Sequence, residues 1–336
     1  MSVYLITGAS GYLGSMLAEY LLGTERDSEV IALARGSASG FGKRGHDPQK
    51  TARAEPLAGR VRAFQADLCD GQFVDRFCAE VEKVDYIFHC ASVTRSSEMA
   101  AHPAEVIQSI VNTTQNVLEL ARRYEINSMV YLSSMEIYGD IDCSDGHRVR
   151  EEEAAAGRVE LLNVRSCYPL GKRMAENICY SYFKEYGVPV KIARLAQTFG
   201  RGISPSDNRV FAQFARSIKN GTDIVLHTEG RSMGNYCAVD DAVEGLCTIL
   251  KKGQSGEAYN VVNEENTMTI RQMAHLAAAQ AADGRIGVRV DIPQDHCYGY
   301  AADTGLRLSG EKLRSLGWRP GKTLTDMYRE LLADMV

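Results

Sequence analysis

Short apolar runs alternate with segments of helical periodicity along the first two thirds of the chain. Apolar residues that recur every three or four positions indicate amphipathic helices, whereas short apolar runs bounded by turns are typical of buried strands. The expected strands are 3–6, 30–33, 61–64, 86–89, 128–132 and 190–193, and the expected helices are 13–22, 72–82, 104–124 and 166–186. This alternation predicts an α/β fold with a doubly wound parallel sheet that is covered by helices on both faces.

The last third of the chain has a more mixed pattern. Helices are expected at 208–219, 240–251 and 270–282, and two more are expected to begin at Ser309 and Leu324. The stretch 36–60 is rich in Gly, Ser, Arg and Ala, which predicts a long surface loop after the second strand.

The length of 336 residues predicts about two domains. We assign residues 1–193, together with about 236–263, to the domain that contains the large sheet. Residues 194–235 and 264–336 are assigned to a smaller C-terminal α/β domain. Two packed domains leave room for a cleft between them, which is where we expect a small-molecule ligand.

Composition and charge narrow the range of partners. The net charge is -5 and no long run of Lys and Arg interrupts the chain, so we expect no nucleic-acid partner. No apolar stretch is long enough to cross a membrane, and residues 1–8 lack the basic and apolar regions of a signal peptide. The nine cysteines are an odd number without a C-x-x-C pair, which argues against disulfides and against a metal site. These features predict a cytoplasmic protein that binds neither metal nor membrane.

A glycine-rich turn joins the first expected strand to the first expected helix. In Thr7-Gly8-Ala9-Ser10-Gly11-Tyr12-Leu13-Gly14, Gly8 allows the tight turn, Gly11 lets a pyrophosphate approach the backbone, and Gly14 lets helix and strand pack closely. The alternative is a plain turn between strand and helix, but the flanking elements are those of a dinucleotide site. A Rossmann-type domain is therefore predicted, with a dinucleotide bound by Gly8, Ser10, Gly11, Tyr12, Leu13 and Gly14.

The spacing G-x-x-G-x-x-G resembles the short-chain dehydrogenase/reductase superfamily, whose catalytic motif is Tyr-x-x-x-Lys. This chain has Tyr168 and Lys172 at the start of an expected helix. Residues four positions apart share one face of a helix, so the ammonium group can lie near the phenol and favour its ionised form. A phenol with an ordinary pKa of about 10 needs such help to act as a base at neutral pH.

The segment 133–139, Ser-Ser-Met-Glu-Ile-Tyr-Gly, resembles the extended branch of this superfamily. We identify the chain as a member of the NAD-dependent epimerase/dehydratase family, because 194–200 and 312–320 also resemble that branch. The motifs around 165–176 are most similar to those of UDP-glucuronate decarboxylases. The resemblance implies that the catalytic residues are Ser134, Glu136, Tyr168 and Lys172, and that the C-terminal domain binds the substrate.

The cofactor expected from the resemblance is NAD(P), with NADP favoured. No acidic residue ends the second strand, and Arg35 could pair with the 2′-phosphate of NADP, helped by Lys43 or Arg44. The alternative for Arg35 is a solvated loop arginine. The resemblance places Asp67 and Leu68 at the adenine, and Ala91, Tyr168 and Lys172 at the nicotinamide end.

In the reaction that the resemblance implies, a nucleotide sugar is oxidised transiently at C4 and the resulting 4-keto sugar is epimerised, dehydrated or decarboxylated. Met135 has no proton to give to a departing hydroxyl, so epimerase or decarboxylase activity is favoured over 4,6-dehydratase activity. Gly234 stands where relatives have an arginine that contacts the diphosphate, and Arg231 is the nearby candidate to replace it.

The nucleotide sugar is expected to contact residues from both domains. The assigned substrate-binding residues are Ser92, Thr94, Gln197, Asn208, Arg209, His227 and Arg231. Relatives pair through the helices that begin here at Ala104 and Ser166, which implies a homodimer. Two other functions remain open: an NADPH-dependent carbonyl reductase that uses the same Ser134, Tyr168 and Lys172, and a non-catalytic dinucleotide-binding protein.

Overall fold

A seven-stranded sheet dominates the computed structural model, which describes residues 1–36, 58–204, 206–292 and 303–335. In sheet order the strands are β10 (Ala258–Val261), β6 (Val190–Leu195), β5 (Ser128–Ser134), β4 (Tyr86–His89), β1 (Ser2–Thr7), β2 (Ser28–Ala34) and β3 (Val61–Gln65). Every neighbouring pair is parallel. The sheet confirms the predicted parallel, doubly wound fold.

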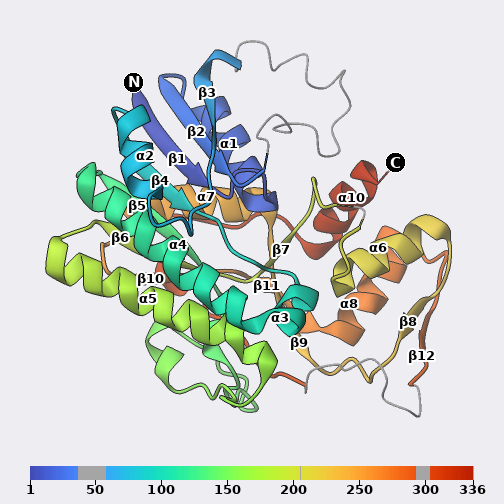
Figure 1. Ribbon diagram of the computed structural model, residues 1–336. Coiled ribbons are helices and arrows are strands. Elements are labelled where there is room, and N and C mark those ends of the chain that lie inside the picture. Colours follow the sequence, from blue (N-terminus) through green and yellow to red (C-terminus); the bar gives the residue numbers. More distant parts are fainter. Residues whose placement is uncertain (37–57, 205, 293–302, 336) are drawn as a thin grey trace.

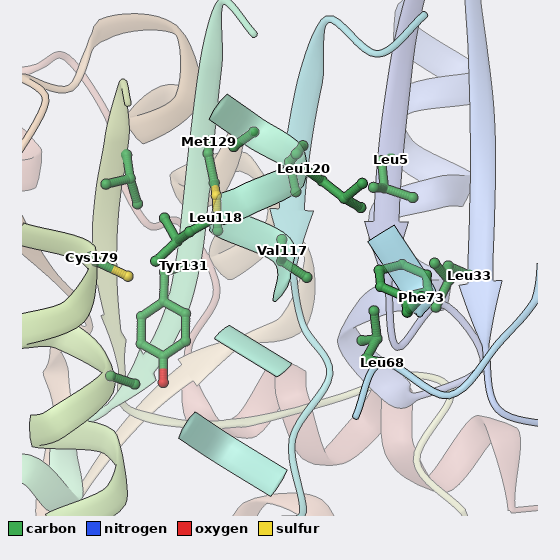
Figure 2. Packing of buried hydrophobic residues seen from close by; sticks show 14 of the residues in the cluster. Leu5, Leu33, Leu68, Phe73, Val117, Leu118, Leu120, Met129, Tyr131 and Cys179 are labelled. Carbon is green, nitrogen blue, oxygen red and sulfur yellow. The ribbon is translucent and has the colours of Figure 1, made fainter. Parts of the chain in front are cut away.

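Helices cover both faces of this sheet because alternate residues of each strand point to opposite sides. On one face, Leu5, Leu33 and Met129 pack against α2 (Phe73–Glu80), α4 (Pro103–Arg123) and α5 (Cys167–Tyr186), as Figure 2 shows for part of this cluster. Full burial of one such side chain contributes about 1.5–3 kcal/mol to folding.

The other face of the sheet packs against α1 (Tyr12–Thr24) and α7 (Val239–Lys252). Tyr4 and Ile6 belong to this second cluster, and so does Trp318 from near the end of the chain. The Trp318 indole N–H donates a hydrogen bond to the carbonyl of Asp241 in α7, at 2.9 Å. A distant part of the chain therefore completes the layer over the N-terminal strands.

The remaining elements form smaller sheets with their own helices. Strands β7 (Gln197–Phe199), β9 (Met233–Ala238) and β11 (Asn263–Thr269) make one sheet, and β8 (Ile224–Leu226) pairs with β12 (Val288–Val290). Their core includes Phe199 and Phe211, whose rings stack at 4.3 Å. Figure 1 shows α6 (Val210–Asn220) and α8 (Ile270–Leu276) on the same side of the molecule as β8 and β12, and α10 (Leu324–Asp334) contacts α6.

Several elements differ from the sequence expectations. Strands β7 to β12 were not expected, and neither was α3 (Ser96–Ala101), which ends just before Pro103 at the start of α4. The helix expected over 270–282 is α8 followed by one π-helical turn at Ala277–Ala281. The C-terminal pair is α9 (Glu311–Ser315) and α10. The boundaries of the two domains stay a prediction.

Among the described helices, none is long and apolar enough to span a bilayer. The described cysteines are all free thiols, and Cys143, Cys167, Cys179, Cys237 and Cys247 are buried. Cys297 lies outside the described residues.

Candidate active site

The order of the strands reverses between β1 and β4, since β2 and β3 lie beyond β1 whereas β5 and β6 lie beyond β4. Ligands of doubly wound folds bind at such a switch point, outside the carboxyl ends of the strands. Thr7 and His89 end the two strands and are paired in register. The glycine turn follows Thr7, Ala91 and Ser92 follow His89, and β5 ends in Ser134. The structure thus brings sequence-predicted residues from three strands to one edge.

The glycine turn packs so tightly that it leaves no room for a side chain at Gly8 or Gly14. Gly8 has a φ of 65°, and a Cβ atom there would lie 2.8 Å from the Cα of Ala91. A Cβ on Gly14 would lie 2.8 Å from the Cα of Ala9. Gly11 is the N-cap of α1, whose first turn has neither a capping side chain nor an acidic residue. The N–H groups of this helix end can therefore donate to a bound anion.

Tyr12, Leu13 and Ser10 play different parts around this turn. The Tyr12 hydroxyl donates to the carbonyl of Arg201 at 2.9 Å, and its ring packs against both the second cluster of the large sheet and the C-terminal core. The Tyr12 side chain is therefore engaged by the protein itself, while its backbone N–H lies at the uncapped start of α1. Leu13 packs against the second cluster, whereas Ser10 is exposed.

Tyr168 and Lys172 lie one turn apart on α5 and are both buried. The Lys172 Nζ lies 5.9 Å from the centre of the Tyr168 ring and 4.7 Å from that of Tyr131. It donates a hydrogen bond of 2.7 Å to the carbonyl of Leu132. Burial lowers the pKa of Lys172 to about 8. An ammonium group has three hydrogens, so Lys172 can donate to a bound ligand as well.

The electrostatic surroundings of Tyr168 differ from the sequence expectation. Burial raises the pKa of its phenol, the nearby Glu136 carboxylate raises it further, and a hydrogen bond with Ser134 opposes the shift. Lys172 was expected to favour the ionised phenol, but in the protein alone burial prevails, because an apolar environment disfavours the charged form.

Glu136 lies two residues beyond Ser134, the last residue of β5. Its side chain is exposed, yet surrounding protein raises the pKa of its carboxyl group, and Arg165 opposes the shift. Arg165 is exposed and precedes Tyr168 by three residues. No role was expected for Arg165, and its spacing of three residues from Tyr168 is the signal that could have indicated one.

Buried polar contacts fix the segment that carries Ser134 and Glu136. The Ser134 Oγ accepts the Glu136 N–H at 3.2 Å and so begins a short 3-10 helix, Met135–Tyr138. The neighbouring Ser133 donates to Glu176 at 2.5 Å, and the same carboxylate forms a buried ion pair of 2.8 Å with Arg194. These bonds join β5, α5 and β6 next to the segment that carries Ser134 and Glu136.

The residues expected at the adenine and ribose lie at the ends of β2 and β3. Arg35 is exposed one residue beyond β2, and its carbonyl accepts a 3.2 Å hydrogen bond from Gln65. Asp67 is exposed, and its carboxylate accepts the Cys69 N–H at 2.9 Å. Leu68 is buried. Lys43 and Arg44 lie outside the described residues.

Three predicted substrate residues lie near the large sheet. Ser92 follows β4, and its Oγ is buried without a hydrogen-bond partner in the described part of the chain. Thr94 is exposed two residues further on. Gln197 is half-buried at the start of β7, which directly follows β6.

The other four belong to the C-terminal elements. Arg209 is the N-cap of α6, pairs with Asp207 at 2.6 Å and lies 4.7 Å above the Phe211 ring, and its charge also acts on the Tyr12 phenol. Asn208 is exposed beside it. His227 follows β8 and shares a 3.0 Å hydrogen bond with the carbonyl of Asp291. Arg231 is exposed two residues before β9.

The glycine at position 234 has a structural reason in this chain. Gly234 is buried in β9, and a Cβ atom there would lie 2.5 Å from the Cζ atom of Tyr236. The Tyr236 ring therefore occupies the space where a side chain at position 234 would begin. Arg231 lies three residues earlier along the chain.

Comparisons with known proteins identify the family that this chain resembles. Residues 4–262 match the model of the NAD-dependent epimerase/dehydratase family. UDP-glucuronic acid decarboxylase 6 of Arabidopsis thaliana is 29% identical over 253 residues, which are 75% of this chain and 67% of that protein. The dTDP-D-glucose 4,6-dehydratase of Dictyostelium discoideum is 25% identical over 260 residues, 76% of this chain and 57% of that protein.

Among solved structures, a dTDP-glucose 4,6-dehydratase from Bacillus anthracis in complex with NAD has the same fold. It superposes with a TM-score of 0.77 at 20% identity and covers 99% of this chain and 96% of its own. The strand order, the glycine turn and the match of residues 4–262 to the family model all indicate the same family. The chain therefore belongs to the NAD-dependent epimerase/dehydratase family of extended short-chain dehydrogenase/reductase enzymes.

Proposed function

We propose that this protein binds NAD(P) and a nucleotide sugar and modifies the sugar by transient oxidation at C4. The observation that carries the proposal is the meeting of Ser134, Tyr168 and Lys172 at the sheet edge where the uncapped end of α1 also lies. The names of the relatives, which include decarboxylases and dehydratases of nucleotide sugars, support the same substrate class.

The residues at the switch point fit a dinucleotide. The uncapped N–H groups at the start of α1 suit a pyrophosphate, and the unpartnered Ser92 Oγ and the Lys172 ammonium are donors at the nicotinamide end. When bound there, NAD(P) would supply the hydride acceptor for oxidation of the sugar and the hydride donor for the later reduction. Arg35, exposed at the end of β2, suits the 2′-phosphate of NADP, so we propose a preference for NADP over NAD.

The side chains of the cluster have distinct roles in the proposed reaction. Tyr168 takes the proton of the C4 hydroxyl, and Ser134 hydrogen-bonds the same oxygen. Lys172 supplies positive charge that stabilises the phenolate of Tyr168. Glu136, whose raised pKa suits proton transfer nearer to neutral pH, acts on the neighbouring carbon of the 4-keto sugar.

Epimerisation or decarboxylation is the proposed outcome, ahead of 4,6-dehydration. Met135 is half-buried beside Ser134 and has no proton to give to a leaving C6 hydroxyl. Loss of carbon dioxide from a 4-keto uronate needs no such donor. Inversion at C4 needs only that the sugar presents its other face before the hydride returns.

A homodimer through α4 and α5 is part of the proposal. The two helices pack on each other and leave apolar side chains exposed, namely Ile107, Met174 and Tyr180. Sedimentation of the purified chain measures the assembly, and Met174→Glu is expected to weaken it.

Mass spectrometry of nucleotide sugars tests the proposed activity. The purified protein is incubated with NAD or NADP and with UDP- and dTDP-linked hexoses and hexuronates, and Tyr168→Phe serves as the control. After chromatographic separation, a new isomer of unchanged mass or a product lighter by carbon dioxide supports the proposal, whereas a product lighter by water reverses the ranking. Oxidation of NADPH by a simple ketone, with every nucleotide sugar unchanged, would identify a carbonyl reductase instead.

A further inference from the structure

His89 is a buried titratable residue that the proposed chemistry does not use. It ends β4 at the switch point and is 1% exposed. Its Nδ1 lies 2.7 Å from the Thr7 Oγ1 across the β1–β4 pair, and its Nε2 lies 3.4 Å from the Thr114 Oγ1 on α4. The ring therefore bridges the two strands on either side of the switch point and the helix that covers them.

The neighbouring hydrogen bonds assign the proton of the ring. Thr114 donates its hydroxyl hydrogen to the carbonyl of Ile110 at 2.7 Å, so towards His89 it acts as an acceptor, and the Nε2 must carry the proton. Thr7 already accepts the Ala91 N–H at 3.3 Å and has its own hydrogen left for the Nδ1. The contacts are thus satisfied when His89 is neutral and protonated on Nε2.

The electrostatic surroundings agree with this protonation state. Burial lowers the pKa of His89 to about 3, and the positive charge of Lys172 adds to the shift. The aromatic ring of Tyr131 packs 5.6 Å away. No acidic side chain contributes to the shift, so no negative charge in the described surroundings stabilises a protonated imidazole.

The Thr7 hydroxyl joins this ring to the floor of the proposed dinucleotide site. It holds the backbone of Ala91, the residue against which Gly8 packs so closely that a Cβ on Gly8 would lie 2.8 Å from its Cα. The Thr7 hydroxyl therefore adds a side-chain contact to the backbone bond of 3.2 Å from the Cys90 N–H to the Thr7 carbonyl, which also joins the turn after β4 to the end of β1.

We propose that His89 is a positioning residue, fixed as the neutral Nε2–H tautomer, which directs the Thr7 hydroxyl and so holds the Gly8 and Ala91 turns together to receive the dinucleotide. The functional part of this inference rests on the proposed binding of NAD(P). The tautomer itself does not.

Nitrogen NMR of the full-length, uniformly ¹⁵N-labelled chain measures the tautomer directly, with the His89 signals assigned by their loss in His89→Gln. We expect an unprotonated Nδ1 and a protonated Nε2, with no titration between about pH 5 and pH 8, whereas an ordinary histidine changes charge in that range. A ring that titrates there, or one that carries its proton on Nδ1, overturns the proposal.

A pair of substitutions at Thr7 tests the positioning role. Thr7→Val keeps the shape of the side chain but leaves the Nδ1 and the Ala91 N–H unpaired, whereas Thr7→Ser keeps the hydroxyl. We expect Thr7→Val to weaken NAD binding about tenfold, and Thr7→Ser to stay within about twofold of the wild type. Dinucleotide titration and thermal unfolding are measured on the same samples.

The outcomes separate positioning from mere stability. If Thr7→Val unfolds at a lower temperature but binds NAD as the wild type does, the hydroxyl is structural only and the proposal fails. If the wild type binds neither NAD nor NADP, the proposed dinucleotide site fails, and the NMR measurement still decides the tautomer.

Discussion

The catalytic role proposed for Tyr168 depends on one group, the hydroxyl of its side chain. Tyr168→Phe removes the hydroxyl that meets Ser134 but keeps the buried ring, so folding and dinucleotide binding should change little. Because the base is lost, we expect turnover of the nucleotide sugar to fall by about 100-fold or more. Steady-state rates and dinucleotide titration measure the two effects.

Tyr180→Phe is the matched control, since Tyr180 lies exposed on the same helix. A Tyr168→Phe enzyme with nearly normal turnover would remove Tyr168 from the catalytic group.

Lys172 should make stability depend on pH. An unfolded lysine has a pKa of about 10.4, whereas burial lowers the pKa of Lys172 to about 8 in the folded protein. Between these values the unfolded chain binds more protons, so Lys172 makes the free energy of unfolding rise with pH. Lys172→Met should flatten that rise in urea titrations at about pH 8, 9 and 10.

The exposed Lys184 on the same helix supplies the control substitution, Lys184→Met, which should leave the slope unchanged. An unaltered slope in Lys172→Met would mean that its ammonium is not held in a dry environment. Lys172→Met should also weaken both dinucleotide binding and turnover.

Arg35 carries the proposed choice between the two dinucleotides. Charge-assisted hydrogen bonds to a phosphate contribute about 1.5–3 kcal/mol, so Arg35→Ala should weaken NADP binding by about one to two powers of ten. Binding of NAD should hardly change, because it lacks the 2′-phosphate. Titration of both dinucleotides into the wild type and the variant tests whether Arg35 binds the 2′-phosphate. An unchanged preference would mean that Arg35 is only a solvated loop arginine.

At the scale of one element, α1 offers a comparison of two glycines. A Cβ on Gly14 would lie 2.8 Å from the Cα of Ala9, whereas a Cβ on Gly23 meets nothing within 4 Å. Gly14→Ala must push α1 away from the turn after β1, and we expect a loss of about 1–3 kcal/mol in the free energy of unfolding. Gly23→Ala should be neutral or stabilising, because alanine favours helix.

Urea unfolding of the two variants measures the difference. Equal stability in Gly14→Ala and Gly23→Ala would contradict the tight packing of α1 against the turn. Dinucleotide titration of Gly14→Ala should also show weaker binding, since the start of α1 faces the proposed pyrophosphate site.

Most strands of the large sheet were predictable because burial on both faces favours short, continuous apolar runs in them. Tyr86–His89 was predicted with its observed ends, and Ser128–Ser134 with its first five residues. Strand β11, Asn-Glu-Glu-Asn-Thr-Met-Thr, has no such run and owes its extended form to pairing with β9. Strands β8 and β12 are three residues each and pair across more than sixty positions, which local patterns do not record.

The positions of Tyr168 and Lys172 on one helix face could be predicted because the motif places them four residues apart. The pKa values of the site could not be predicted, because they depend on how deeply each group is buried. The raised pKa values of Tyr168 and Glu136 arise from chain segments that meet only in the folded protein. The glycine motif also gives no sign of the hydrogen bond between the Tyr12 hydroxyl and the carbonyl of Arg201, which is 189 positions away in sequence.

At the scale of the whole molecule, Tyr12 joins α1 to the C-terminal elements. Tyr12→Phe keeps the packing of the ring but removes the bond to the carbonyl of Arg201. We expect the free energy of unfolding to fall by about 1 kcal/mol, the usual contribution of one such bond. Tyr20→Phe on the same helix is the control, and equal values for the two variants would show that the Tyr12 bond contributes nothing.

The position of Trp318 in the second cluster has a consequence for synthesis. The apolar side chains of β1 and α1 leave the ribosome before α7 and Trp318, which complete the layer that covers them. The nascent chain therefore carries an uncovered apolar face until Trp318 has been made, and such faces attract chaperones or associate with one another. We expect chains that stop short of Trp318 to aggregate rather than to accumulate as a soluble N-terminal domain.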